Sequence, residues 1–222
     1  MIQITASLMC ASQLYLYRDF HALLKAGIDM FHFDIMDGEF VENIALNIDL
    51  IKELRALTHK KFDAHLMVRH PSKYIKRLKE AGINIVCFHI ESEDDPYYVI
   101  DLIKREGMEA GLAINPETSW EKISPYLAEI KYLMFMTVKP GYTSQKFENS
   151  ILYKIDHFQR YARKKRIAVK IIADGSINPE ILKLLHERGV EIFVGGTSGL
   201  FNSEGFNNNL EILRQRDKIQ TN

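Results

Sequence analysis

The run Phe31-His32-Phe33-Asp34-Ile35-Met36-Asp37-Gly38 gives the first indication of the fold class. Apart from a few polar side chains, it is apolar on both faces, which is typical of a strand in a parallel sheet covered by helices. His32 and Asp34 are two residues apart, so their side chains point to the same side of the strand. The run therefore predicts a parallel α/β fold in which polar groups gather at the carboxyl end of a strand.

Seven further runs rich in Ile, Val, Phe and Met accompany the one at 30–36, and they span residues 4–9, 62–68, 85–90, 109–114, 132–138, 168–173 and 191–195. Segments with helical spacing separate them, such as the one that contains Ile48, Ile51 and Leu54. Asn178 before Pro179 is a typical helix start. Eight alternating units predict a (β/α)₈ TIM barrel, while a doubly wound open sheet would produce the same alternation.

The length and composition fit one large domain. A chain of 222 residues lies in the range of a single α/β barrel, and no linker or shift in composition divides it, so residues 1–222 are predicted to form one domain. Lys plus Arg and Asp plus Glu both number 29, which gives a formal net charge of zero. The chain lacks the overall field of nucleic-acid or membrane binders, so we expect neither partner, and any anion must be held locally.

The two cysteines, Cys10 and Cys87, form no C-x-x-C pair and cannot build a disulfide framework or a zinc knuckle. The N-terminal residues lack the pattern of a signal peptide, and no apolar run is long enough to span a bilayer. A cytoplasmic location is therefore expected.

Polar side chains at three strand ends form a candidate metal site: His32, Asp34, His65 and Asp174. Each of them alone has an ordinary explanation as a packing or turn residue. In a parallel barrel, however, they converge on the same mouth. Two imidazoles and two carboxylates suit one divalent transition-metal ion, such as Zn²⁺, Mn²⁺, Fe²⁺ or Co²⁺, better than they suit Mg²⁺.

Glycine-containing turns after the last two strands form a candidate phosphate cradle, made of Gly175, Ser176, Gly196, Thr197 and Ser198. Backbone amides in such turns approach an anion closely, and TIM barrels hold phosphate after the seventh and eighth strands. A tight turn alone would also require these glycines. The loop 138–145, with its Pro-Gly turn, is long enough to act as a lid over the mouth.

Six short motifs lie along nearly the whole chain: Ser7-Leu8-Met9, His32 to Gly38, His65-Leu66-Met67-Val68, Pro140-Gly141, Asp174-Gly175-Ser176 and Val194-Gly195. Together they resemble the ribulose-phosphate 3-epimerases and the similar allulose-6-phosphate 3-epimerases, a family of metal-dependent barrels of the ribulose-phosphate-binding type. The stretches 115–118 and 196–201 are more similar to the allulose branch. The resemblance thus favours D-allulose 6-phosphate as substrate, converted to D-fructose 6-phosphate, with D-ribulose 5-phosphate as the alternative.

The resemblance also implies roles for individual residues. It implies that the metal is bound by His32, Asp34, His65 and Asp174, and that Asp34 and Asp174 act as the acid and base pair. It implies that the phosphorylated ketose is contacted by Ser7, Gly141, Tyr142, Thr143 and Ser144, together with the phosphate cradle. Proton transfer would pass through an enediolate stabilised by the cation. Barrels of this type often associate, so a homo-oligomer is expected.

Three positions depart from the family pattern: Lys139 replaces an Asp, Ser144 replaces a Gly and Glu42 replaces a Pro. Because serine does not readily replace a glycine with positive φ, we expect the loop after residue 138 to differ in conformation. Such a difference would also fit a non-catalytic sugar-phosphate-binding barrel. A metal-free decarboxylase or lyase is a further alternative, but it would need a Lys near Asp63, where position 65 is His.

Overall fold

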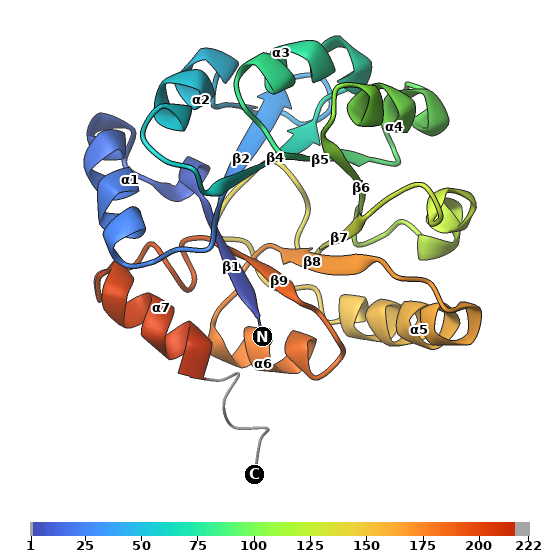
Figure 1. The fold of residues 1–222 in the computed structure, drawn as a ribbon. Helices are drawn as coiled ribbons and strands as arrows, with labels where there is room; N and C mark the ends of the chain where they lie inside the picture. Colours follow the sequence, from blue (N-terminus) through green and yellow to red (C-terminus); the bar gives the residue numbers. More distant parts are fainter. Residues whose placement is uncertain (1, 216–222) are drawn as a thin grey trace.

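Parallel strands at the centre of the molecule close into a barrel, as shown by a computed structural model that describes residues 2–215 (Figure 1). The eight barrel strands are β1 (Gln3–Ser7), β2 (Met30–Asp37), β4 (Lys61–Met67), β5 (Ile85–His89), β6 (Glu109–Ile114), β7 (Tyr132–Met136), β8 (Lys170–Asp174) and β9 (Ile192–Gly195). The first strand pairs with both β2 and β9, which closes the ring. The predicted (β/α)₈ TIM barrel is confirmed, and the open sheet is excluded.

Helices surround this barrel on all sides (Figure 1). They are α1 (Leu16–Lys25), α2 (Ile48–Arg55), α3 (Ile75–Glu80), α4 (Pro96–Arg105), α5 (Ser150–Lys165), α6 (Pro179–His186) and α7 (Phe206–Gln215). The predicted start of α6 is confirmed, because the Asn178 side chain accepts a hydrogen bond from the backbone N–H of Ile181 at 2.9 Å. None of the described helices is long and apolar enough to cross a membrane.

Besides the short 3₁₀ segments Leu8–Cys10, Gln13–Tyr15 and Pro71–Lys73, two elements differ from the simple alternation of strand and helix. A short strand, β3 (Ile44–Ala45), pairs antiparallel with the end of β2. Between β6 and β7 the chain forms a 3₁₀ helix, η4 (Trp120–Tyr126), instead of an α-helix. Pro125 lies inside that segment, and its missing N–H and its ring disfavour the hydrogen bonding of an α-helix.

Side chains alternate along β2 between the interior of the barrel, which receives the polar ones, and the outside, where apolar ones pack against the helices. Phe31 and Phe33 point outward to the helices, where the Phe31 ring stacks on Phe20 at 4.2 Å. His32 and Asp34, on the opposite face, are buried. In the parallel register His32 lies opposite Asp63 and Asp34 opposite His65. The barrel therefore places polar side chains from neighbouring strands in its interior, near its mouth.

Candidate metal and acid–base site

Three strands bring four titratable side chains together at the carboxyl end of the barrel. His32 and Asp34 come from β2, His65 from β4 and Asp174 from the last position of β8. One nitrogen or oxygen from each of the four lies within 4.8 Å of the others. The structure thus brings the whole predicted ligand set into one cluster that could hold a divalent ion.

The distances within this cluster suit a shared cation. His65 Nδ1 lies 3.3 Å from Asp34 Oδ1 and 3.3 Å from Asp174 Oδ2. His32 Nε2 lies 3.3 Å and 3.6 Å from the same two oxygens. This Nε2 is buried, and among the described residues it has no hydrogen-bond partner. A buried imidazole nitrogen without a partner, facing two carboxylates, fits a metal ligand, so the residues present suit the predicted cation.

The orientation of His32 is fixed from behind by Asp63. Nδ1 of His32 donates to Asp63 Oδ1, and the other carboxylate oxygen, Oδ2, accepts from Thr5 Oγ1 at 2.8 Å. All three side chains are buried. Because Nδ1 donates in this bond, loss of the second ring proton leaves a lone pair on Nε2, directed at the cluster, which is the state a metal ligand requires.

Charge pairing shifts the ionisation of all four side chains. Burial opposes protonation of His32, but the carboxylates of Asp63 and Asp34 outweigh burial and raise the pKa of His32 well above its usual value. The pKa of His65 is raised in the same way by Asp174 and Asp34. Burial opposes ionisation of Asp34 and Asp174, yet the two imidazoles lower the pKa of both carboxyls. A cation would therefore bind with release of protons from the imidazoles.

A cavity opens above the cluster. Its walls include Asp34, Asp174 and all ten predicted substrate-contact residues, namely Ser7, Gly141, Tyr142, Thr143, Ser144, Gly175, Ser176, Gly196, Thr197 and Ser198. Met36, Met67 and Met136 add an apolar part of the wall. The position of these residues agrees with substrate binding, and contact with a substrate stays a prediction for each of them.

The turn after β8 in the predicted cradle contains two consecutive residues with positive φ. Gly175 has a φ of 115°, and a Cβ at this position would lie 2.6 Å from Val138 Cγ2. Ser176 follows with a φ of 49°. After β9, the N–H groups of Leu200 and Phe201 both donate to the carbonyl of Gly196. Turns of this kind can bind anions in other proteins, so their position agrees with the predicted cradle, and phosphate binding stays a prediction.

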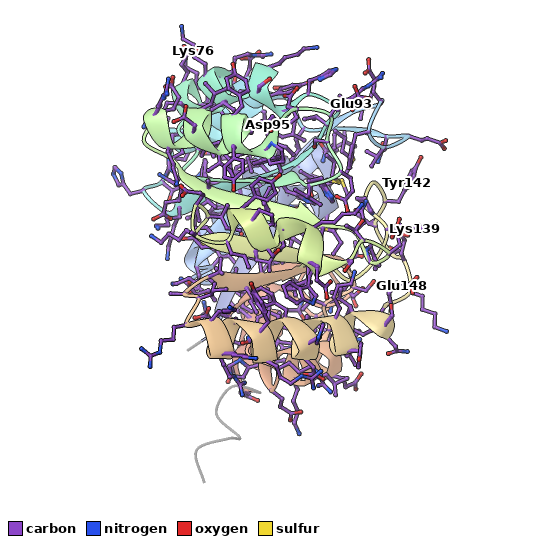
Figure 2. All side chains as sticks on the ribbon, turned by 90° about the vertical axis from the view of Figure 1, so that its right-hand side faces the viewer. Lys76, Glu93, Asp95, Lys139, Tyr142 and Glu148 are labelled. Carbon is purple, nitrogen blue, oxygen red and sulfur yellow. The ribbon has the colours of Figure 1, made fainter. Side chains whose placement is uncertain are left out.

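The loop after β7 is tied across the mouth of the barrel. Tyr142 Oη donates to the carbonyl of Glu42 at 2.5 Å, and Asn43 Nδ2 donates to the carbonyl of Gly141 at 2.7 Å. Lys139 and Tyr142 lie at the right-hand end of the molecule in Figure 2. Ser144 has a φ of 61°, so the serine itself takes the left-handed conformation that a glycine would favour.

Sequence reasoning missed three residues behind the cluster: Asp63 as the partner of His32, and His89 with Glu91 behind His65. His65 Nε2 lies 2.8 Å from His89 Nε2, and His89 Nδ1 lies 3.1 Å from Glu91 Oε2. A signal was present, because His89 and Glu91 lie two residues apart at the end of a strand, as His32 and Asp34 do. The contact with His65 itself required the strand register.

Comparison with known sequences identifies close relatives. A family profile described as the ribulose-phosphate 3 epimerase family matches residues 3–201. The ribulose-phosphate 3-epimerase of Bacillus subtilis is 34% identical over 199 residues, which cover 89% of this chain and 92% of the relative. The cytoplasmic isoform of ribulose-phosphate 3-epimerase from Oryza sativa is 36% identical over 180 residues, which cover 79% of this chain and 77% of the relative.

Comparison with solved structures supports the fold. The crystal structure of KGPDC from Streptococcus mutans superposes with a TM-score of 0.70. The match covers 98% of this chain and 97% of that chain at 13% sequence identity. At this identity the similarity shows a shared barrel fold, whereas the sequence relatives carry the information on family.

Proposed function

The chain belongs to the ribulose-phosphate 3-epimerase family, and from that premise we propose that it is a metal-dependent 3-epimerase with D-ribulose 5-phosphate as its substrate. Membership makes the chain an isomerase of carbohydrate phosphates. The observation that carries the proposal is the buried cluster of two aspartates and two histidines, of which both aspartates line the cavity. The resident ion is proposed to be Zn²⁺, Mn²⁺, Fe²⁺ or Co²⁺.

The preference for D-allulose 6-phosphate drawn from the sequence has less support than the ribulose alternative. The relatives described above are named for ribulose-phosphate. The stretch 115–118, one of the two that resemble the allulose branch, lies beside Glu91 and Lys154. None of its four residues, all within the described part of the chain, lines the cavity. That stretch therefore has no direct contact through which to select the length of the sugar.

The two carboxylates supply the proton transfers. Epimerisation beside a ketone removes the proton of carbon 3 on one face and returns a proton on the other. Asp34 and Asp174 come from different strands and both reach the cavity, so one accepts the proton while the other, already protonated, donates. Ser7 Oγ donates to Asp34 Oδ2 at 2.7 Å and holds that carboxylate in place. After each turnover the two side chains have exchanged roles.

His32, His65 and the two aspartates would hold the cation, and their pairing partners orient them for it. When bound, the ion supplies positive charge beside the substrate oxygens and so stabilises the negative charge that develops there. The cradle turns hold the phosphate, and the loop after β7 limits access of water to the cavity.

The replacement Asp174→Asn tests the acid–base assignment. We expect exchange of the carbon-3 proton with D₂O, followed by NMR, to fall about 10²- to 10⁴-fold, which is the usual contribution of general acid–base catalysis. The matched control is Asp101→Asn on α4, where the side chain is 49% exposed and pairs with Arg105. Undiminished exchange in a folded Asp174→Asn variant that still holds its ion would rule out the assignment.

A comparison of kcat/KM on D-ribulose 5-phosphate and D-allulose 6-phosphate, with the metal-loaded protein, tests the substrate. The proposal expects the five-carbon substrate to be preferred. The reverse order would restore the allulose assignment, and a protein that binds both sugars but turns over neither would be a sugar-phosphate-binding barrel.

The remaining assignments follow from the same proposal. A phosphorylated ketose is the expected ligand, and the zero net charge gives no support for nucleic-acid or membrane partners. We propose a cytoplasmic location, as the name of the rice relative states for that protein, and a homo-oligomeric state.

A further inference from the structure

We propose that His89 and Glu91 are positioning residues that hold His65 in the one tautomer able to bind a cation through Nδ1. The inference rests on the proposed function, because it concerns how the predicted metal ligand His65 is oriented. Neither residue lines the cavity among the described residues, so neither touches substrate. Both act through His65.

The three side chains form a hydrogen-bonded chain that leads away from the cluster. His65 Nδ1 faces the two aspartates, while its Nε2 lies 2.8 Å from His89 Nε2. The two imidazole rings are nearly parallel, with centroids 5.0 Å apart and an interplanar angle of 28°. His89 is fully buried, and its Nδ1 lies 3.1 Å from Glu91 Oε2. Each link therefore joins one ring nitrogen to one defined partner.

The carboxylate of Glu91, at the far end of these hydrogen bonds, determines which ring nitrogen of His89 and of His65 carries the proton. An ionised Glu91 accepts only, so His89 Nδ1 carries a proton and His89 Nε2 is left with a lone pair. That lone pair accepts the proton of His65 Nε2, which leaves the lone pair of His65 on Nδ1, toward Asp34 and Asp174. If the direction reversed, Nδ1 of His65 would carry a proton and could not bind a cation.

Glu91 is held in its ionised form and in a fixed place. Its second oxygen, Oε1, accepts from the backbone N–H of Asn115 at 3.0 Å. Burial opposes its ionisation, but the hydrogen bonds from His89, Thr118 and Asn115 lower the pKa of Glu91 below its usual value. The loop that carries Asn115 is fastened by Lys154, whose Nζ donates to the carbonyls of Asn115 and Thr118 at 3.0 and 2.6 Å.

Both oxygens of Glu91 accept hydrogen bonds. Glu91→Gln is informative because a glutamine side chain cannot accept at both positions. A glutamine has one carbonyl oxygen, so its NH₂ group must face either the Asn115 N–H or His89 Nδ1. In the first case the buried N–H of Asn115 loses its acceptor. In the second case the direction of the hydrogen bonds from residue 91 through His89 to His65 is reversed. His89→Phe keeps the aromatic packing against Phe40, 4.9 Å away, but removes both nitrogens.

His89→Gln is the conservative rescue. Its amide oxygen can accept from His65 Nε2, and its NH₂ group can donate to Glu91. Asp94→Asn is the matched control for Glu91→Gln. Asp94 accepts from His70 Nδ1 at 3.0 Å and from the backbone N–H of Ser72 at 2.9 Å, in the same manner as Glu91, but outside the chain that reaches His65. The two carboxylates are also similarly exposed, at 19% for Glu91 and 17% for Asp94.

The experiment measures the Zn²⁺ affinity of each full-length variant by competition with a chelator, and the visible spectrum of the Co²⁺ form reports the ligand geometry. Glu91→Gln and His89→Phe are expected to bind Zn²⁺ about 10- to 100-fold more weakly and to show an altered Co²⁺ spectrum. His89→Gln is expected to recover most of the affinity, and Asp94→Asn to keep all of it. Urea unfolding of the metal-free proteins shows whether a loss of Zn²⁺ affinity comes only from a lower stability of the folded protein.

The outcomes separate this inference from the proposed function. A wild-type protein that binds no Zn²⁺ overturns the proposed function and the positioning role together. A wild-type protein that binds Zn²⁺ no more tightly than Glu91→Gln and His89→Phe overturns the positioning role alone. Equal weakening by Asp94→Asn also overturns it, because a loss shared with the control reflects loop stability and not the orientation of His65.

Discussion

At the scale of single residues, Asp34 shows how one carboxylate can take part in two functions. Oδ1 faces His32 and His65, while Oδ2 accepts from Ser7 Oγ at the cavity wall. One oxygen is thus directed at the proposed cation and the other at the space in which a substrate would lie. The imidazoles of His32 and His65 lower the pKa of Asp34, so they favour the ionised form that a metal ligand requires.

Gly175 is the residue of the cradle with the least steric freedom. Its φ of 115° disfavours any side chain, and a Cβ would lie 2.6 Å from Val138 Cγ2 and 2.9 Å from Thr137 Oγ1. We expect Gly175→Ala to lower the free energy of unfolding by about 2 kcal/mol. We also expect it to raise KM for the sugar phosphate about tenfold, with a smaller effect on kcat. Urea unfolding and steady-state kinetics measure the two effects.

Gly27→Ala is the control for backbone strain alone. Gly27 has a φ of 77°, but nothing lies within 4 Å of a Cβ built there. This variant should lose about 1 kcal/mol of stability and keep its KM. If Gly175→Ala keeps its KM as well, the turn after β8 does not contribute to phosphate binding.

At the scale of elements, the strands were predictable because burial on both faces leaves a continuous apolar signature. All eight predicted runs overlap the barrel strands, and the ends that carry polar residues were correctly located. The two-residue strand β3 escaped prediction, because Ile44 is exposed and its pairing with Asp37 depends on the end of β2. The 3₁₀ helix η4 escaped because helical spacing does not distinguish it from an α-helix.

Glu109, at the start of β6, connects neighbouring strands at the end of the barrel opposite the cavity. Its carboxylate accepts from Tyr132 Oη at 2.7 Å, from Lys61 Nζ at 3.2 Å and from Lys131 Nζ. Burial opposes ionisation, but these donors outweigh it and lower the pKa of Glu109 to about 2. The group thus links β4, β6 and β7 at the end remote from the cavity, where polar contacts contribute to stability.

The lowered pKa of Glu109 predicts a pH dependence of folding. Since the folded pKa lies below the unfolded value of 4.5, the contribution is present above pH 4.5 and is lost as the pH falls toward about 2. Replacing Glu109 by Gln should remove about 1 kcal/mol of this acid-dependent stability, a value reduced for solvent screening.

Unfolding in urea between pH 7 and pH 3 measures this loss, with Glu53→Gln on the exposed surface of α2 as the control. Wild type should lose more stability over this range than Glu109→Gln does. Equal losses in the two proteins would contradict a stabilising role for the ionised Glu109.

At the scale of the whole molecule, closure of the barrel is what makes the cluster possible. β2 and β4 are neighbours, but β8 reaches them only because the sheet curves until β1 pairs with both β2 and β9 (Figure 1). The cluster therefore joins Asp174 to residues that lie more than a hundred positions earlier in the chain. Its stability should be linked to that of the entire barrel.

This linkage predicts the unfolding behaviour of the full chain. If residues 1–222 form one domain, urea transitions followed by circular dichroism and by fluorescence of Trp120, the single tryptophan, should coincide. Free Zn²⁺ at 100 times its Kd should stabilise the protein by about 2.7 kcal/mol. His32→Ala should abolish that increase. Two separate transitions would contradict the single domain, and an unchanged increase in His32→Ala would contradict its role as a ligand.

The sequence by itself determined the alternation of strand and helix and the strand ends at which chemistry could occur, because burial and strand period are local properties of the chain. It also indicated His32, Asp34, His65 and Asp174 as a set. Only the tertiary structure decided which side chains hold that set in place, since the contacts of Asp63 with His32 and of His89 with His65 depend on strand register. Register and barrel curvature arise from packing among distant segments, which a reading along the chain does not contain.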